Sequence, residues 1–446
     1  MSVPPTEAER ANQFALLRQR RFAPFFWTQF TGAANDNIFK FALTVLLTYR
    51  LPHAWLPPEL AGLVIAGLFI LPFVLFSATA GQLADKYDKA RVLRAVKSME
   101  VVIMAAALWG LWHGHVTVLL LCIVGMGLHS TLFGPAKFAY LPAHLRAHEL
   151  TGGNGLVEMG TFVAILLGNV AGGVLIALPD GGALAVGLCC LAVALLGRWT
   201  AQRVPATPAP MPDLRIEWNP WRETWRNLRL AREDRLLWHT LLAISWMWFY
   251  GAVFLAQFPA FAKEVLHGDE QVALMLLVIF SLGLGLGSLA CERLSRGRVE
   301  IGLTPLGALA MTVFAIDLFF ACAQVQAPVQ GLWTASDFLQ QPAHGRVVID
   351  LLGLSLGAGV YSVPMYALFQ WRGPTTHVSR LVAANNILNA LYMVVSSLLA
   401  GALLALGLDT ADLFLWLGVA NAMHLLWLLR AEPEYAQRAR DWLLRR

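Results

Sequence analysis

The sequence predicts an all-α membrane protein with twelve transmembrane helices arranged as two six-helix bundles. Three observations indicate this class: a very apolar composition, apolar runs that recur along the whole chain, and a loop motif that occurs in both halves. Of the 446 residues, 57% are hydrophobic and only 14% are charged, and the mean hydropathy is +0.59. A water-soluble protein of this length would have to expose much of that apolar surface, so a polytopic membrane protein is expected.

The apolar runs have the length of membrane-spanning helices. A helix needs about 20 predominantly apolar residues to cross the hydrocarbon core of a bilayer. Each run is therefore expected to form one span. The predicted spans lie near residues 22–50, 59–80, 92–112, 116–139, 154–178, 183–203, 237–262, 270–291, 302–324, 346–370, 380–406 and 409–430.

Lys and Arg are concentrated in every second loop, and this predicts the orientation of the chain. They gather in the N-terminal segment, in the loops after the second, sixth and eighth predicted spans, and in the C-terminal tail. The opposite loops contain only Arg50, Lys263 and Arg346. Because cytoplasmic loops are enriched in Lys and Arg, both termini are expected in the cytoplasm. The net charge of +5 follows this topology and does not suggest nucleic-acid binding.

Composition and motifs argue against several other classes of protein. The polar N-terminal segment has no apolar region followed by a cleavage site, so no signal peptide is expected. The cysteines form no C-x-x-C pair and all fall in apolar runs, so neither a metal site nor a disulfide framework is predicted. We find no nucleophile–base set, and therefore expect neither an enzyme nor a bound cofactor. The cysteines are Cys122, Cys189, Cys190, Cys291 and Cys322.

A long basic connection, residues 204–236, divides the chain into two halves. Residues 1–203 are expected to form the N-terminal six-helix bundle, and residues 237–446 the C-terminal bundle with a cytoplasmic tail. The connection begins with VPATPAPMP, a stiff Pro-rich linker.

The rest of this connection, NPWRETWRNLRLAR, predicts an amphipathic helix. Asn219 suits the N-cap position, and Pro220 suits the first helical position. Trp221, Trp225 and Leu228 would share one face, surrounded by arginines. This pattern is typical of a helix that lies on the cytoplasmic leaflet. The alternative is a linker helix that docks on the protein itself.

The loop between the second and third predicted spans carries a signature motif. In GQLADKYDKARVL, Gly81 permits close helix approach, and Asp85 at a helix end is followed by Lys86, Lys89 and Arg91. The stretch resembles the G-x-L-x-D-[RK]-x-x-[RK]-[RK] signature of the major facilitator superfamily, with one residue of slack at the last base. The resemblance implies that Asp85 pairs with bases and helix ends of the neighbouring half. Gly81, Asp85, Lys86 and Arg91 would then form a conformational latch.

A weaker copy of this motif lies at the matching place in the second half. In GSLACERLSRGRVE, Gly287 corresponds to Gly81, and Glu292 corresponds to Asp85 with a shift of one residue. Such an internal repeat is expected of a transporter built from two related bundles.

Polar residues inside the predicted spans are the candidates for a binding site. Ionisable side chains within membrane helices usually face a cavity and mark a pathway for polar cargo. Asp36 and Lys40 are four residues apart and share a helix face with Asn37 nearby, and Asn154 and Glu158 have the same spacing. The alternative is that these side chains only hold helices together. The later spans add Gln370, Asn385, Asn386 and Asn389.

Several longer segments resemble one family within this superfamily. The segments QFTGAANDNIFKFAL, FGPAKFAYLP, LTGGNGLVEMGTFVAILLGNVAGGVL and VPMYALFQ resemble lysophospholipid transporters. They are more similar still to the transporter part of proteins in which this module is fused to a 2-acylglycerophosphoethanolamine acyltransferase. The resemblance covers nearly the whole membrane region.

The resemblance also implies roles for particular residues. The Asp-Asn pair of the first span lies in the family's transport cavity, which implies this position for Asp36 and Asn37. The fifth-span motif matches Asn154 and Glu158. The family carries a basic residue in the seventh span, which is absent here, and Lys40 is the candidate to replace it. The remaining matches are Gln370, Asn385, Asn386 and Asn389.

The implied function is the movement of lysophospholipids from the outer to the inner leaflet of a bacterial inner membrane by alternating access. A sodium ion or a proton is a possible coupling ion, and a cytoplasmic acyltransferase is a possible partner. Two alternatives remain open: efflux of drugs or other amphiphiles by the same fold, and a scaffold for an acyltransferase that transports nothing.

Overall fold

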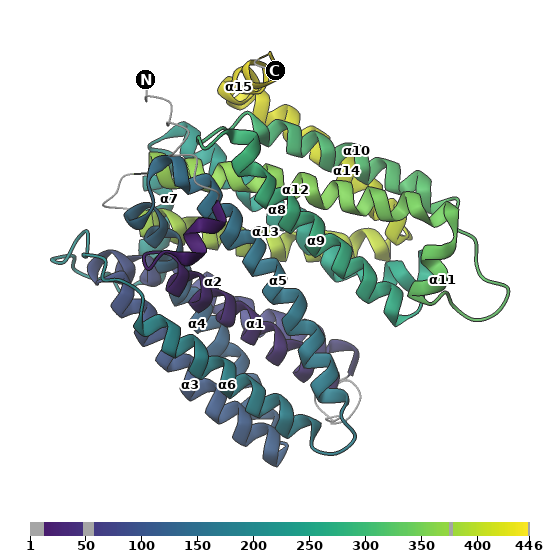
Figure 1. Ribbon diagram of the computed structural model, residues 1–446, viewed down its shortest axis with the longest axis horizontal. Coiled ribbons are helices and arrows are strands. Elements are labelled where there is room, and N and C mark those ends of the chain that lie inside the picture. Colours follow the sequence, from purple (N-terminus) through teal and green to yellow (C-terminus); the bar gives the residue numbers. More distant parts are fainter. Residues whose placement is uncertain (1–12, 48–57, 374–377, 445–446) are drawn as a thin grey trace. The chain divides into compact units, whose positions relative to one another are not determined.

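The computed structural model describes residues 13–47, 58–373 and 378–444, and their regular structure is helical (Figure 1). Within these ranges there is no strand, and Gly268 and Trp333 form one isolated bridge. The chain divides into two compact units, and each includes a segment from the other half of the sequence. Unit 1 consists of Met1–Arg146, Val163–Asp234 and Arg372–Ala390, and unit 2 of Ala147–Phe162, Arg235–Trp371 and Leu391–Arg446.

Unit 1 contains most helices of the N-terminal half. Its core is formed by α2 against α4, by α3 against α4 and α6, and by α1 against α6, and α3 and α6 run side by side in Figure 1. Phe39, Met104, Ile123 and Cys190 are among the buried residues of this core. The helices are α1 (Ala23–Val45), α2 (Pro58–Lys86), α3 (Lys89–His113), α4 (Val116–His144), α6 (Gly182–Gln202), α7 (Pro220–Arg232), the last part of α5 (Leu150–Ala177) and the first part of α13 (Val378–Ala405).

Two glycines allow α5 to approach α1 within unit 1. A Cβ atom at Gly168 would lie 2.6 Å from the carbonyl oxygen of Ala34, and one at Gly172 would lie 2.6 Å from that of Ile38. Both distances are shorter than any side chain tolerates. Small residues of this kind allow close backbone contact between membrane helices, where lipid provides no hydrophobic drive for association.

Unit 2 contains most helices of the C-terminal half. α10 and α8 pack against α14, and α15 covers the ends of α10 and α14. The rings of Phe254 on α8 and Phe414 on α14 stack with centroids 4.2 Å apart. The elements are α8 (Arg235–Ala260), a π-helical turn (Phe261–Val265), α9 (Glu270–Ser295), α10 (Leu303–Cys322), α11 (Ala335–Gln340), α12 (Gly345–Arg372), α14 (Thr410–Ala431) and α15 (Pro433–Leu444), with the first part of α5 and the last part of α13.

The start of α3 differs from the expectation. The sequence placed the third span near 92–112 and treated the preceding bases as a loop. The Asp88 side chain instead accepts a hydrogen bond from the Arg91 amide, 2.9 Å, so the helix begins at Lys89. An aspartate at the N-cap satisfies an amide that has no partner within the helix. The basic residues from Lys89 to Lys97 therefore lie in the first turns of α3.

Within the described residues, ten helices are long and apolar enough to cross a membrane. α1 and α3 are not among them, although their 23 and 25 residues are sufficient in length. Both carry ionisable side chains in their interior, such as Asp36 on α1 and Glu100 on α3. With these two included, the helices match the twelve that the sequence predicts.

Candidate functional site

Asp36 lies in unit 1 with its carboxylate turned toward α4. It is 9% exposed, and its Oδ2 accepts a hydrogen bond of 2.7 Å from the Ser130 hydroxyl. One turn later, the Lys40 ammonium lies over the ring of Phe69 on α2, 4.1 Å from the centroid. A cation over an aromatic face is attracted by the ring quadrupole. The acid and the base that the sequence placed on one face therefore contact different helices.

Asn37 lies between these two charged residues. Its side-chain amide donates to the carbonyl oxygen of Ala33, 2.7 Å away. This is a bond to the preceding turn of the same helix, so Asn37 contributes no contact between helices through that group. Its side chain is only half-buried.

A second polar group in unit 1 was missed by the sequence analysis. Lys97 and Glu100 on α3 form an ion pair whose side chains are both fully buried. The Asn35 amide on α1 donates to Glu100 Oε1, 2.7 Å, and His129 Nε2 on α4 lies 3.3 Å from Glu100 Oε2. A buried charge is tolerated only when it is paired and hydrogen-bonded. These contacts therefore join α1, α3 and α4.

Glycines make room for this ion pair. A Cβ at Gly197 on α6 would lie 2.8 Å from Lys97 Nζ, and one at Gly32 on α1 would lie 3.1 Å from the same atom. The sequence did contain signals for the group: Lys97 and Glu100 are three residues apart beside an apolar run, and His129 is isolated in one.

Asn154 and Gln370 bind each other in unit 2. The Asn154 amide donates to Gln370 Oε1, 2.7 Å, and the Gln370 amide donates to Asn154 Oδ1, 3.0 Å. Both side chains are buried, and Glu158, one turn along α5, is buried as well. Two amides that exchange both hydrogen bonds satisfy each other in an apolar environment. The structure thus joins α5 and α12, which are far apart in the sequence.

The three asparagines predicted on α13 lie in its first part, which belongs to unit 1. Asn385, Asn386 and Asn389 are all buried. Asn386 faces α4, because a Cβ atom at Gly134 would lie 2.7 Å from its Nδ2. The predicted site residues are therefore divided. Unit 1 holds Asp36, Asn37, Lys40, Asn385, Asn386 and Asn389, and unit 2 holds Asn154, Glu158 and Gln370.

Two of the four predicted latch residues contact α13. Asp85 Oδ2 lies 3.1 Å from Arg380 Nε, and both side chains are buried. A Cβ at Gly81 would lie 2.8 Å from the Cβ of Ala383, so the glycine permits this approach. The sequence analysis did not identify Arg380 as the partner of Asp85, because the two are distant in the sequence.

The other two latch candidates are placed differently. Arg91 is exposed in the first turn of α3. The Lys86 ammonium lies 5.8 Å from the centroid of the Tyr87 ring. In the second half, the loop with the weaker motif copy contacts α5, since the Thr151 hydroxyl donates to the carbonyl oxygen of Arg298, 3.0 Å. Both motif loops therefore contact a helix from the opposite half of the sequence.

The linker between the halves is bound to the end of α2. The Met211 amide donates to the Asp85 carbonyl oxygen, 3.0 Å. The Gln82 side chain accepts from the Glu217 amide, 2.7 Å, and donates to the Glu217 carbonyl oxygen, 3.0 Å. The Thr207 amide donates to Asp88 Oδ2, 2.9 Å. The Pro-rich segment thus lies against the end of α2 and the N-cap of α3.

The helix α7 turns its polar side toward the protein. Glu223, Asn227 and Ala231 are buried, whereas Trp221 and Trp225 are 61% and 66% exposed. Burial raises the pKa of the Glu223 carboxyl, and the nearby Arg226 and Arg380 lower it. α7 therefore packs on the protein by its polar face and exposes its tryptophan face.

Asp317 on α10 is paired in unit 2. Its Oδ2 accepts a hydrogen bond of 2.9 Å from Arg346 Nε, and its Oδ1 contacts the same guanidinium. The aromatic residues of α8 are partly core residues. Tyr250 and Phe254 are buried, and Trp246 Nε1 donates to Asn421 Oδ1, 2.8 Å.

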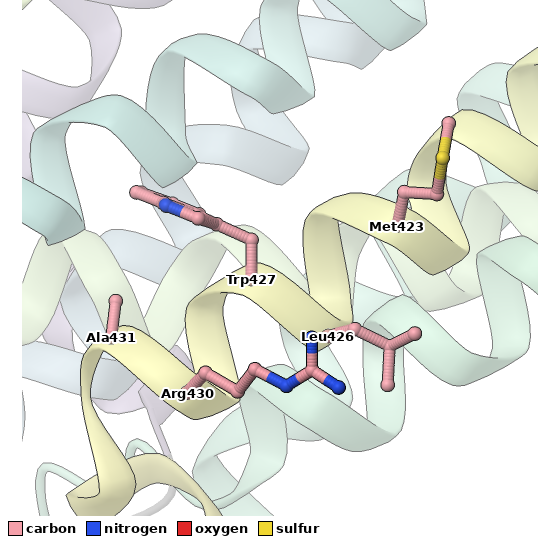
Figure 2. Close-up of a pocket in the computed structure, with 5 residues that line it drawn as sticks. All are labelled: Met423, Leu426, Trp427, Arg430 and Ala431. Atoms are coloured by element: carbon pink, nitrogen blue, oxygen red, sulfur yellow. The ribbon is translucent and has the colours of Figure 1, made fainter.

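A shallow surface groove lies along α14. Its lining residues have an apolar side and a single charge, Arg430, as Figure 2 shows. It shares no residue with the polar groups described above. Tryptophan and arginine near the end of a membrane helix are typical of the lipid–water interface. The groove is lined by Met423, Leu426, Trp427, Arg430 and Ala431.

The fold and these groups together define a class of protein. Membrane-length helices with buried ionisable groups, and two motif loops that each contact a helix of the opposite half, are features of a secondary transporter. Residues 25–397 match the family model of the Major Facilitator Superfamily, and the chain belongs to this family.

Relatives that are similar to this chain include lysophospholipid transporters. The lysophospholipid transporter LplT of Enterobacter sp. (strain 638) is 27% identical over 371 residues, which cover 80% of this chain and 82% of the relative. LplT of Escherichia coli O157:H7 (strain EC4115 / EHEC) is 27% identical over 352 residues, 77% and 79% of the two chains. The resemblance inferred from the sequence is thus confirmed. The human organic anion transporter MFSD10 (TETRAN) has a similar fold, with a TM-score of 0.73, 12% sequence identity, and coverage of 92% of this chain and 99% of that chain.

Proposed function

We propose that this transporter moves lysophospholipids from the outer to the inner leaflet by alternating access of two bundles, residues 1–203 and 237–446. The substrate class is supported by the similarity to LplT proteins over about four fifths of the chain. The linker 204–236 joins the bundles. We place the protein in the bacterial inner membrane with both termini in the cytoplasm, because both terminal segments are rich in Lys and Arg, as cytoplasmic segments of membrane proteins usually are.

The observation that carries the proposal is the burial of Asp36 with one carboxylate oxygen lacking a hydrogen-bond partner. This carboxylate is buried on a membrane-length helix, and its Oδ1 has no hydrogen-bond partner among the described residues. A buried ionised group is costly unless a partner compensates it. A lysophospholipid headgroup often carries an ammonium, which would pair with Asp36 or Glu158. Lys40, whose ammonium lies over the Phe69 ring, is the candidate for the phosphate.

Each unit holds further polar residues that are proposed as headgroup ligands. Asn37 is half-buried next to Asp36. Asn154 and Gln370, which exchange hydrogen bonds, would change partners when a headgroup arrives. Such amides donate and accept at once, which suits a zwitterionic headgroup. The asparagines of α13 are proposed as further headgroup ligands: Asn385, Asn386 and Asn389.

The latch and α7 have proposed roles at the cytoplasmic side. Asp85 and Arg380 would hold one conformation and separate in the other. Trp221 and Trp225 are exposed beside Arg222, Arg226 and Arg229, and this face of α7 is proposed to rest on the anionic cytoplasmic leaflet. A cytoplasmic acyltransferase would be the enzyme that consumes the delivered lysophospholipid.

Reconstituted transport tests the proposal. Labelled lysophosphatidylethanolamine is added outside proteoliposomes, and the fraction protected from extraction by albumin is measured. The wild type is expected to protect label above protein-free vesicles, and Asp36→Asn is expected to abolish that gain. Asp180→Asn, an exposed carboxylate in the loop between α5 and α6, is the matched control and should behave as wild type.

Three outcomes would contradict the proposal. No protection by the wild type would exclude lysophospholipid transport. Normal protection by Asp36→Asn would remove Asp36 from the mechanism. Export of unrelated amphiphiles, or co-purification of an acyltransferase without any flux, would instead support efflux or a scaffold.

A further inference from the structure

A path of polar groups runs through unit 1 from α1 to α3. The Ser130 hydroxyl donates to Asp36 Oδ2, 2.7 Å, and Ser130 Oγ lies 3.5 Å from His129 Nδ1, at the limit of hydrogen-bonding distance. The other nitrogen, His129 Nε2, lies 3.3 Å from Glu100 Oε2. The imidazole thus lies between a hydroxyl and a carboxylate.

We propose that His129 binds the coupling proton of this transporter, which reaches it from Asp36 through Ser130. The proposal rests on the proposed function, because it assigns the ion that drives that transport. It goes beyond the headgroup site, since His129, Ser130 and Glu100 have no part in binding the lipid.

Counting hydrogens supports a site for one extra proton. Ser130 has a single hydroxyl hydrogen, which it donates to Asp36, so it presents only lone pairs to His129 Nδ1. The ionised Glu100 carboxylate is also only an acceptor. A neutral imidazole has one N–H and can serve only one of these two acceptors. A second proton allows both ring nitrogens to donate.

The pattern of unpaired atoms points the same way. Asn35 Oδ1 and Asp36 Oδ1 are buried without a hydrogen-bond partner among the described residues. A network that only held helices together would be expected to satisfy its members, since unpaired buried polar atoms cost stability. The proton-free arrangement therefore leaves capacity that a bound proton would use.

The exposed fractions of these side chains indicate the end at which a proton would enter the path. Glu100 is 0% exposed and His129 is 2% exposed, whereas Asp36 is 9% exposed. Asp36 is thus the end nearest to water, and a proton would enter there. Chains of carboxylate and imidazole groups inside membrane helices commonly act as proton relays.

The surrounding charges accommodate an added proton. Glu100 is already paired with Lys97. The Lys40 ammonium, one turn from Asp36, lies over the Phe69 ring. A protonated His129 would therefore be a second cation near the Asp36 carboxylate. The charged or titratable groups that face this path are Asp36 and Lys40 on α1, Lys97 and Glu100 on α3, and Cys190 on α6.

The experiment measures lysophosphatidylethanolamine uptake into proteoliposomes with and without an imposed pH gradient, acidic outside, at zero membrane potential and without sodium. The readout is the ratio of the two initial rates. For the wild type this ratio should exceed one, and for His129→Gln it should fall to one. His113→Gln, an exposed histidine at the end of α3, should keep the wild-type ratio.

Failure of this inference differs from failure of the proposed function. Wild-type uptake with a ratio of one, or uptake driven by a sodium gradient instead, would overturn the proton site and leave lysophospholipid transport intact. Absence of any wild-type uptake would contradict the proposed function itself.

If His129→Gln transports no lipid, proton binding is measured in the absence of lipid. Purified protein in weakly buffered detergent is given a rapid acid pulse, and the amount and the rate of proton uptake per molecule are measured. The wild type should bind one proton more than His129→Gln. Ser130→Ala should slow this proton uptake, because it breaks the path from Asp36. Equal proton binding by wild type and His129→Gln would overturn the proposal.

Discussion

Asp85 and Arg380 form a buried ion pair, with Oδ2 and Nε 3.1 Å apart, although 295 positions separate them in the sequence. The pair joins the end of α2 to the first turns of α13. The linker is bound to the same place, since the Met211 amide donates to the Asp85 carbonyl oxygen. The end of α2 therefore holds a helix of the opposite half and the connection between the halves at once.

Removal of one member of this pair should destabilise the packing of α13 against α2. Asp85→Asn or Arg380→Gln leaves the other charge buried and unpaired, which costs about 3–5 kcal/mol. We expect a lower thermal unfolding temperature and faster modification of a cysteine introduced at Ser379.

A double variant is the control for this prediction. Asp85→Asn with Arg380→Gln leaves no unpaired charge, and should recover part of the loss, because residues in direct contact are not additive. If the two single losses simply added in the double variant, the pair would have no energetic coupling.

Gly197→Ala should destabilise the Lys97–Glu100 pair. The new Cβ would lie 2.8 Å from Lys97 Nζ and 2.7 Å from Thr31 Oγ1, so both of these side chains must move. Overpacking of this kind typically costs about 1–3 kcal/mol, and it should be seen as a lower melting temperature in detergent. Gly67→Ala on α2 is the control, because a Cβ there has nothing within 4 Å. Equal melting of both variants would argue against the tight packing around Lys97.

The Glu223 carboxyl should make the stability of the protein depend on pH. Burial raises its pKa above the ordinary value of 4.5, so the ionised form is disfavoured in the folded state. This carboxyl imposes no penalty below about its unfolded pKa, and its penalty is complete above the raised pKa. Glu223→Gln should therefore raise the melting temperature at neutral pH, and the gain should vanish as the pH falls toward 4.5.

The control for this pH series is Glu233→Gln. Glu233 is exposed at the end of α7, so its replacement should change the melting temperature little at any pH. A constant difference between wild type and Glu223→Gln across the series would show that the effect comes from packing and not from ionisation.

The tryptophan face of α7 should lie in the headgroup region of the bilayer. A fluorophore attached at Trp225→Cys, in full-length protein in nanodiscs, should be quenched by nitroxide placed on lipid headgroups. The same label at Asp213→Cys, on the linker before α7, is the comparison and should be quenched less. Anionic lipid should strengthen the difference, since Arg222, Arg226 and Arg229 surround the tryptophans. Equal quenching at both positions would contradict the leaflet contact.

The correct and the missed predictions differ in the range of the interactions involved. The spans were readable because hydrophobic length is a local property of the chain. α3 began earlier than expected, since its bases were read as a loop although Asp88 caps a helix that starts at Lys89. The face of α7 that meets the protein, Glu223 and Asn227, could not be read from a pattern that places tryptophans on the opposite side.

The sequence by itself determined that this is a membrane protein with twelve membrane-length helices, where those helices lie in the chain, and which polar residues fall inside them. Only the tertiary structure decided which polar side chains contact each other: Asp85 with Arg380, Asn154 with Gln370, and Glu100 with Lys97 and Asn35. The physical reason is that apolar length is encoded residue by residue. The partner of a buried polar group is instead set by how helices distant in the sequence pack together.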